Sequence, residues 1–364
     1  MRNLGFLVNY MVYSKKNIFW SSIISGLLYP YFSFFNFFRR KHNLDKLEIK
    51  RILVTEYHRI GDVLIIIQAL NSIKKRFPES HLILICNSPV AKLAKHLNLA
   101  DEVVPTAVPW TNWNWSLFDW YKTRSFAKSF SKKNIDLAFD FKGDFRNSWF
   151  LWNTYPKVSF GYNTTGGGYF FTNPQTMNQD LHQSERAEAL VSNVGCIPIK
   201  EQFDKININE HGAVVIHIGA TDPKRSWPIK CWIDLIKLLS DKFTITVVET
   251  IESERLIEQL NEQKIEVGRF KGDLIELKNW LINQRCLVAP DSMAGHLAAY
   301  VQIPVISVFG SQDPKLTRPV NKLGAIVKPD KPCGHSSNHW RLCRECMESI
   351  QPLKVYEVIC NEVK

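Results

Sequence analysis

The side chains best suited to chemistry lie in the segment 287–319, LVAPDSMAGHLAAYVQIPVISVFGSQDPKLTRP. A short apolar run, a predicted strand, leads into Asp291 and Ser292, which are good caps for a helix expected over 293–301. A second run rich in Val and Ile, 304–309, predicts the next strand. Free backbone N–H groups and the positive dipole end of that helix point beyond the first strand. A phosphate or pyrophosphate fits there for electrostatic reasons.

A second group of reactive side chains lies near the C-terminus, in the run CGHSSNHWRLCREC. Its members are of types that hold zinc: Cys333, His335, His339, Cys343 and Cys346. The C-x-H spacing of the first pair and the short interval favour a metal-free loop. The sequence leaves open whether this group binds a metal.

The composition sets the class of protein and its possible partners. A chain of 364 residues, 45% hydrophobic and 22% charged, suits two globular domains. The net charge of +11 predicts anionic partners: nucleic acid, nucleotide phosphates or an acidic membrane face. No basic arm, helix-turn-helix or zinc-finger pattern stands out, so we expect no nucleic-acid partner. Four cysteines sit singly in or beside apolar segments, which indicates a reducing compartment: Cys86, Cys196, Cys231 and Cys286.

The N-terminal segment, residues 1–46, contains an uncharged run from Asn17 to Phe38 between basic flanks. The run is long enough to approach a bilayer span. Pro30, several polar residues and many aromatic rings make it a poor transmembrane helix and a better interfacial anchor. No small-residue cleavage site follows, so we do not expect a signal peptide. The alternative is a helix packed on the protein's own surface.

The rest of the chain alternates strands and helices, which predicts an α/β protein with two parallel-sheet domains. A polar stretch, 196–212, is the candidate linker, and ligands are expected at the carboxyl ends of the strands. The aromatic stretch 110–121 predicts a loop or lid, the glycine-containing stretch 158–171 an ordinary turn, and 355–363 a helix packing back across the domains. Strands are expected at 51–56, 81–86, 103–104, 135–141, 213–218 and 244–248, and helices at 62–77, 89–97, 144–153, 183–194, 230–239, 252–263 and 273–283.

Three segments carry a resemblance to a known family. ILVTEYHRIGDVLIIIQALNSIKKRFP resembles the first strand, loop and helix of the lipopolysaccharide heptosyltransferases, glycosyltransferase family 9, whose members show R-x-G-D-V. IHIGATDPKRSWPIKCWIDLIKLL resembles the start of their second domain, and PDSMAGHLAAYVQIPVISVFGSQDP their D-S/T-G-x-x-H-L-A element and F-G-x-x-D-P exit. The motifs occur in family order and spacing and cover most of residues 50–350.

The resemblance implies a GT-B fold, in which two Rossmann-like parallel-sheet domains face a cleft. Residues 47–205 would form the acceptor-binding domain and residues 206–364 the nucleotide-sugar-binding domain. The implied reaction transfers heptose from ADP-heptose, with inversion, to the inner core of lipopolysaccharide. The resemblance also implies that this reaction requires no metal and no cofactor. The enzyme would act peripherally at the cytoplasmic side of the bacterial inner membrane.

Asp62 is the candidate general base, since it matches the aspartate that the family uses in this role. Inverting transfer needs a base to take a proton from the acceptor hydroxyl, on the face opposite the leaving diphosphate. The alternative is that Asp62 only caps a helix, although a cap alone does not require the preceding Gly61. Arg59 and Gly61 of the same motif are candidate acceptor-binding residues.

The donor site is expected around the two later motifs. Developing charge on the leaving diphosphate needs basic side chains or helix starts, and either Lys224 or Arg225 would supply the basic group; a solvated charge pair is the alternative. Met293 stands where the family usually has Gly and would crowd a closely bound diphosphate. Glu254 is a candidate for the ribose hydroxyls, with a helix-start glutamate as the alternative. The other candidate donor-binding residues are Thr221, Asp291, Ser292, Gly295 and His296.

Two other functions remain open at this point. A related transferase could use another nucleotide sugar for surface polysaccharide. A nucleotide-sugar-binding protein without turnover is the second alternative, but it would not need the Asp62 motif.

Overall fold

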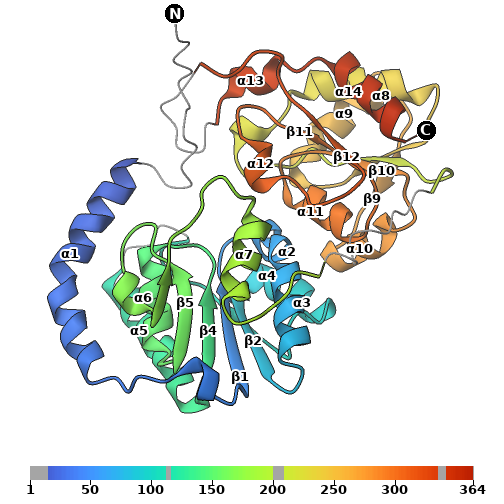
Figure 1. Cartoon of the computed structure of the whole chain (residues 1–364). Helices are drawn as coiled ribbons and strands as arrows, with labels where there is room; N and C mark the ends of the chain where they lie inside the picture. Colours follow the sequence, from blue (N-terminus) through green and yellow to red (C-terminus); the bar gives the residue numbers. More distant parts are fainter. Residues whose placement is uncertain (1–14, 112–115, 200–208, 335–341, 364) are drawn as a thin grey trace, which may run out of the picture.

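The computed structural model of the protein describes residues 15–111, 116–199, 209–334 and 342–363. It contains two α/β units, each built on a six-stranded parallel sheet (Figure 1). The first unit is blue to green in Figure 1 and the second is yellow to red. The boundary predicted between residues 205 and 206 lies outside the described residues.

The first sheet has the strand order β3-β2-β1-β4-β5-β6, and all neighbouring strands are parallel. β1 is central, and Ile52 pairs with Leu82 of β2 on one side and Leu137 of β4 on the other. This is the Rossmann order, in which the chain reverses direction across the sheet between β1 and β4 and leaves a crevice at their carboxyl ends. The strands are β1 Arg51–Glu56, β2 His81–Asn87, β3 Glu102–Thr106, β4 Leu137–Asp140, β5 Val158–Tyr162 and β6 Asn173–Gln175.

The second sheet repeats this topology, with the order β12-β11-β10-β7-β8-β9. Its central strand β7 lies between β8 and β10, so the corresponding crevice lies at the carboxyl ends of β7 and β10. The strands are β7 Val214–Ile216, β8 Ile245–Val248, β9 Gly268–Phe270, β10 Cys286–Pro290, β11 Val305–Val308 and β12 Gly324–Val327.

Helices cover both faces of the first sheet, and the sequence misassigned three stretches here. The helix predicted over 62–77 is two helices divided at Ile66, whose backbone (φ −89°, ψ 3°) leaves helical values. Residues 117–121, predicted as loop, begin α5 because Trp120 packs on Trp110 and Trp149. Residues 158–162, predicted within a turn, form β5. The helices are α2 Ile60–Ile65, α3 Ile67–Arg76, α4 Ser88–His96, α5 Leu117–Ser129, α6 Phe145–Asn153 and α7 Gln183–Ser192.

The second sheet is covered by α8, α9 and α14 on one face and by α10 and α11 on the other. The prediction that the last helix crosses both domains is wrong, since α14 packs on α8 and beside β11 and β12 of its own unit. Its Val355 and Ile359 complete the core of that unit. The helices are α8 Ile229–Ser240, α9 Glu254–Glu262, α10 Leu274–Leu281, α11 Met293–Tyr300, α12 Pro314–Thr317, α13 Arg344–Glu348 and α14 Pro352–Glu362.

The two units meet through α2 and α11, whose apolar residues belong to one continuous buried core. Polar contacts flank this core. Lys92 Nζ of α4 lies 2.6 Å from Asp273 Oδ2 at the start of α10, and His182 Nε2 lies 3.0 Å from the backbone oxygen of Arg318. These contacts hold the carboxyl edges of both sheets against each other.

Helix α1, Lys15–Phe37, runs along the outer side of the first unit beside α6 (Figure 1). Two of its polar side chains face the protein: Ser25 Oγ accepts a hydrogen bond from the Gly167 N–H at 2.9 Å, and Asn36 Oδ1 accepts one from Trp152 Nε1 at 2.8 Å. Phe32 is buried against Trp152. Large apolar residues face outward: Phe19, Trp20, Leu27, Tyr29, Tyr31, Phe34, Phe37 and Phe38.

By length and composition, Ile18–Phe37 could cross a membrane, with a mean hydropathy of 1.3 and 11% of its most apolar window buried. A helix that buries Ser25 and exposes most of its aromatic rings departs from the usual surface pattern, in which the apolar face is buried. The contacts of Ser25, Phe32 and Asn36 make it a surface-packed helix as well. Membrane attachment by residues 1–46 remains a prediction.

Candidate active site between the two sheets

Asp62 lies at the carboxyl edge of the first sheet, in the first turn of α2, which follows β1. Its Oδ2 accepts a hydrogen bond from the backbone N–H of Arg59 at 3.0 Å, and its Oδ1 lies 2.7 Å from Lys142 Nζ. The N-cap residue of α2 is therefore Arg59 and not Asp62. Asp62 is the third residue of the helix, and its carboxylate accepts the hydrogen bond from the N-cap backbone N–H. Lys142 follows β4, so the ion pair spans the crevice between the two central strands.

Burial raises the pKa of Asp62, but the charges of Lys142 and His58 and the Arg59 hydrogen bond outweigh it, so its pKa lies well below the ordinary range. Lys142 also lies 3.4 Å from the buried carboxylate of Glu56. Burial lowers the pKa of Lys142, and the two carboxylates more than reverse this. The side chain of Asp62 is thus held ionised and partly open to solvent, as a proton acceptor in the cleft requires.

The sequence did not identify Glu56, Lys142 or Asp140 as site residues. Asp140 ends β4 and is fully buried, and burial, followed by the charge of Glu56, raises its pKa to about 7. Asn147 Nδ2 donates a hydrogen bond to it at 3.2 Å. The signal was available: FDFKGD stands at the end of a predicted strand, where side chains reach the carboxyl edge of a parallel sheet.

Arg225 and Asp291 form the matching ion pair at the second sheet. Arg225 Nη1 lies 3.1 Å from Asp291 Oδ2, and these residues follow β7 and β10 respectively. The amide of Gln312, in the orientation that satisfies both neighbours, donates to Asp291 at 2.6 Å and accepts from Arg225 at 3.0 Å. The sequence did not identify Gln312. Both basic candidates line the pocket beside Asp291. Arg225 is held there by Asp291 and Gln312, whereas the side chain of Lys224 is exposed.

Buried polar atoms without hydrogen-bond partners gather around this second crevice. Within the described ranges they include His217 Nδ1, Arg225 Nε, Thr250 Oγ1, Ser292 Oγ and Ser311 Oγ. Each belongs to a loop or helix start that follows β7, β8, β10 or β11. Because an unsatisfied buried polar group costs about 1–3 kcal/mol, such a group is expected to find a partner. A polar ligand at the carboxyl edge of the second sheet would supply these partners.

The remaining donor-site candidates lie at varied positions. Thr221 is exposed in the turn before Arg225, and Glu254 is exposed at the start of α9. Glu252, which the sequence did not single out, lies closer to the crevice: a Cβ on Gly219 would be 3.5 Å from its Oε2. Gly295 faces Pro319, because a Cβ there would lie 3.0 Å from Pro319 Cγ. The roles of Thr221, Glu254 and Gly295 stay predictions.

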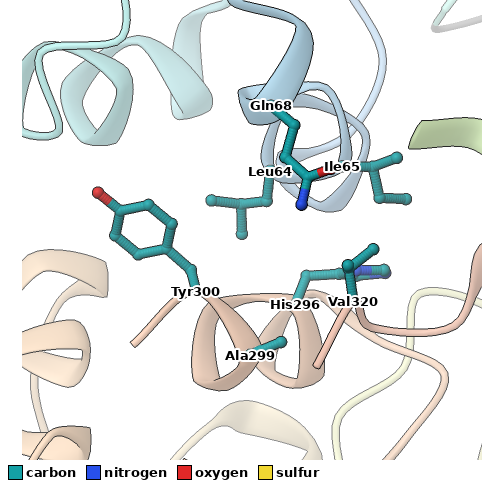
Figure 2. Close-up of a pocket in the computed structure, with 7 residues that line it drawn as sticks. All are labelled: Leu64, Ile65, Gln68, His296, Ala299, Tyr300 and Val320. Atoms are coloured by element: carbon teal, nitrogen blue, oxygen red, sulfur yellow. The ribbon is translucent and has the colours of Figure 1, made fainter. Parts of the chain in front are cut away.

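The two crevices meet where α2 contacts α11. A Cβ on Gly61 would lie 2.9 Å from His296 Cδ2, so the glycine allows the helices to approach. His296 is buried, which lowers its pKa to about 4 and keeps its ring neutral near pH 7. Figure 2 shows His296 of α11 beneath Leu64, Ile65 and Gln68 of the first unit. A small pocket remains between these helices.

Asp291 responds electrostatically to Asp62 across this interface. Burial raises the pKa of Asp291, Arg225 lowers it, and the charge of Asp62 raises it again, to about 6 in all. The two carboxylates therefore belong to one electrostatic site, with one from each unit.

The cysteines near the C-terminus also come together. The sulfur atoms of Cys333, Cys343 and Cys346 all lie within 4.8 Å of one another. His335 and His339, predicted to accompany them, lie outside the described residues.

Two Rossmann-ordered parallel sheets whose switch points face each other define the GT-B class of glycosyltransferases. The model of glycosyltransferase family 9 (heptosyltransferase) matches residues 123–344, well over half of the 364 residues. The chain belongs to this family and is a glycosyltransferase.

Individual relatives agree with this assignment. The lipopolysaccharide heptosyltransferase 1 of Pseudomonas aeruginosa is 21% identical over 305 residues, which cover 78% of this chain and 85% of the relative. The structure of E. coli heptosyltransferase WaaC with ADP superposes with a TM-score of 0.68 at 19% identity, over 86% of this chain and 99% of that one. E. coli ADP-heptose lipopolysaccharide heptosyltransferase II gives 0.67 at 15% identity, over 86% and 98%. The structural likenesses confirm the predicted fold.

Proposed function

We propose that this protein transfers heptose from ADP-heptose to the core of lipopolysaccharide, with inversion at the sugar carbon. The acceptor hydroxyl oxygen forms a bond to that carbon while the bond to the diphosphate breaks, and ADP leaves. Support comes from the family and from the described substrates of its members: WaaC of E. coli has been seen with ADP and with ADP-2-deoxy-2-fluoro heptose.

In this reaction Asp62 takes the proton of the acceptor hydroxyl. The strong pairing with Lys142 makes Asp62 a weak base, so it accepts the proton late, as the hydroxyl becomes acidic during bond formation. Arg59, which is exposed in the same turn, would contact the acceptor, and Gly61 would act through the close approach of α2 to α11.

The leaving diphosphate is stabilised by Arg225 and by the N-terminus of α11. Arg225 is held in the crevice by Asp291 and Gln312, so its fork of N–H donors is oriented before the ligand arrives. Ser292 Oγ stands at the start of α11, where the backbone N–H groups and the dipole favour an anion. Together these groups supply positive charge without a metal, and we expect transfer to need none.

One observation carries this proposal. An ionised carboxylate lies at the switch point of the first sheet, and it faces a crevice at the switch point of the second sheet in which several polar groups of the described residues lack hydrogen-bond partners. Asp62 is held ionised on the first unit, and five unpartnered polar atoms among those residues lie in the loops and helix starts that follow β7, β8, β10 and β11 of the second. Base and diphosphate would thus lie on opposite sides of the transferred sugar. Inversion needs this arrangement.

The test is a donor and acceptor screen on the full chain. ADP-heptose should raise Tm more than ADP-glucose, UDP-glucose or GDP-mannose does, and heptose should be transferred to lipopolysaccharide core that lacks heptose. A larger Tm shift and turnover with another nucleotide sugar would assign the crevice to that donor and reject ADP-heptose. Donor binding without hydrolysis or transfer would leave only a binding function.

We also propose that α1 holds the enzyme peripherally on the cytoplasmic side of the inner membrane. The outward rings of α1 would enter the headgroup region while the exposed Lys15, Lys16, Arg40 and Lys41 at the two ends of the helix meet anionic lipid. A lipid-embedded acceptor would then lie near the cleft.

Substitution of exposed rings tests this attachment without removing the buried contacts of α1. Trp20→Ser, Leu27→Ser and Phe37→Ser combined should release the protein from phosphatidylglycerol vesicles. Leu117→Ser with Ile251→Ser removes two equally exposed apolar residues elsewhere and should leave sedimentation unchanged. Equal sedimentation of both variants would reject the anchor.

A further inference from the structure

Three thiols converge in the second unit, outside the site described above. Cys333 lies after β12, Cys343 is the N-cap residue of α13, and Cys346 lies within α13. Their sulfur atoms all lie within 4.8 Å of one another, and none of the three is in a disulfide bond. The cysteines of the two cores, such as Cys86 and Cys286, are buried among apolar residues instead. The convergence of three cysteine side chains is therefore particular to Cys333 and the start of α13.

The spacing of the three sulfur atoms fits one small, thiophilic metal ion. Zinc bonds to cysteine sulfur at about 2.3 Å in tetrahedral sites, which places bound sulfur atoms about 3.8 Å apart. The three sulfur atoms need to move only slightly closer together to reach that spacing. Zinc binds cysteine as the thiolate, so its binding would release the thiol protons.

We propose that Cys333, Cys343 and Cys346 bind one structural zinc ion. Three thiolates select zinc over magnesium or calcium because hard cations prefer oxygen ligands. The fourth tetrahedral position needs an oxygen or nitrogen donor. Glu345 Oε2, 3.0 Å from Cys343 Sγ, lies close enough to provide one after a small movement.

The position of this site connects it to the donor crevice. α13 packs against the short helix Pro223–Arg225, which carries the proposed diphosphate ligand. Met347, next to Cys346, lies against Gly310 and lines a pocket with Arg225 and Asp291. A zinc ion that ties Cys333 to both ends of the first turn of α13 would fix this wall. This consequence rests on the proposed function, whereas the zinc site itself does not.

The metal content of the untagged full chain tests the site. Protein purified from zinc-supplemented cells, after dialysis, should contain about one zinc per chain by plasma mass spectrometry. Cys333→Ser, Cys343→Ser and Cys346→Ser should each lose most of it. Cys231→Ser and Cys360→Ser are matched controls, since these half-buried cysteines lie outside the group, and both should keep the zinc.

A measurement on the unmutated protein guards against variants that fail to fold. Titration with an organomercurial should release zinc in proportion to modified thiols, and cobalt substitution should give thiolate-to-metal charge-transfer bands. Absence of zinc, iron in its place, or a disulfide within the group by mass spectrometry would each overturn the proposal.

The donor consequence has its own readout. Loss of zinc in Cys346→Ser should weaken ADP binding by about threefold to tenfold, with the Cys360→Ser affinity unchanged. If zinc is present but ADP binding is absent in every form, the zinc site stands and the proposed function fails. If ADP binds normally and no zinc is found, the zinc site fails and the proposed function stands.

Discussion

The two switch points have the same topology but opposite electrostatics. Each has an acid and a basic residue paired across its two central strands: Asp62 with Lys142, and Asp291 with Arg225. Burial raises the pKa of both acids, yet the final pKa of Asp62 is lowered and that of Asp291 is raised to about 6. Asp62 accepts a backbone hydrogen bond and has two cationic neighbours, Lys142 and His58. Asp291 also has two, Arg225 and Arg59, but burial and the negative charge of Asp62 outweigh their effect on its pKa.

The difference shows that the strand order determines where each crevice lies, whereas the loops after the strands determine its charged and hydrogen-bonding groups. The first crevice holds a carboxylate that stays charged, as a proton acceptor must be. The second holds an arginine with unsatisfied polar neighbours, as a site for a phosphate-containing ligand requires. The following experiments test whether these two roles are separate.

Asp62→Asn should have the largest effect. Removal of the base should lower kcat by about 10²–10⁴-fold, with the Kd for ADP nearly unchanged, because the base belongs to the acceptor side. The measurement is steady-state transfer beside calorimetric ADP binding. Asp136→Asn is the control, since this ion-paired carboxylate precedes β4 at the opposite edge of the sheet. Retention of more than about a tenth of the activity, against that typical loss, would reject Asp62 as the base.

Lys142→Met should destabilise the first crevice and change its pH dependence. Glu56 and Asp62 would lose their shared cation, which should lower the free energy of unfolding by about 3 kcal/mol in urea titrations. Because Lys142 lowers the pKa of Asp62, its loss should move the acid limb of kcat/KM to higher pH. Lys133→Met, which removes a half-buried ion pair with Glu102 away from the crevice, should leave that limb in place. An unmoved limb in Lys142→Met would show that Asp62 does not set it.

Arg225→Ala should weaken ADP binding by about 10- to 100-fold, or about 1.4–2.7 kcal/mol. Lys224→Ala removes the neighbouring exposed charge and should change the Kd by less than about threefold, as a screened surface charge does. Isothermal titration of both variants measures the difference. Unchanged affinity in both would leave the start of α11 as the anion site.

Gly61→Ala should have the smallest effect and tests the contact between the two crevices. Alanine favours the helix by about 1 kcal/mol, but crowding of His296 should offset that gain at about 1–3 kcal/mol. In a His296→Ala background the same substitution should therefore stabilise. Chemical denaturation of the four proteins gives a coupling energy of about 1–2 kcal/mol. Gly61→Ala combined with the distant Lys133→Met is the control, and the effects of these two substitutions should add. Additive effects of Gly61→Ala and His296→Ala would show that the helices do not meet at Gly61.

The sequence by itself determined the local elements and the family. β1 was predicted residue for residue because RILVTE is an apolar run with clear ends, and the start of α11 was predicted from Asp291 and Ser292. Three ordered motifs identified the family and the fold. These features depend on residues close together in the chain, which local periodicity and capping can reveal.

Tertiary structure decided which distant side chains act together. Lys142 reaches Asp62 only because β1 and β4 are neighbours, and Gln312 reaches Arg225 only after β11 joins the second sheet. Trp120 lies in a helix rather than a loop because other rings pack on it. The outward rings of α1 and the convergence of three thiols are also settled by packing. Sequence patterns fix which way a segment folds, but contacts between remote segments depend on the strand order and on how the two sheets face each other.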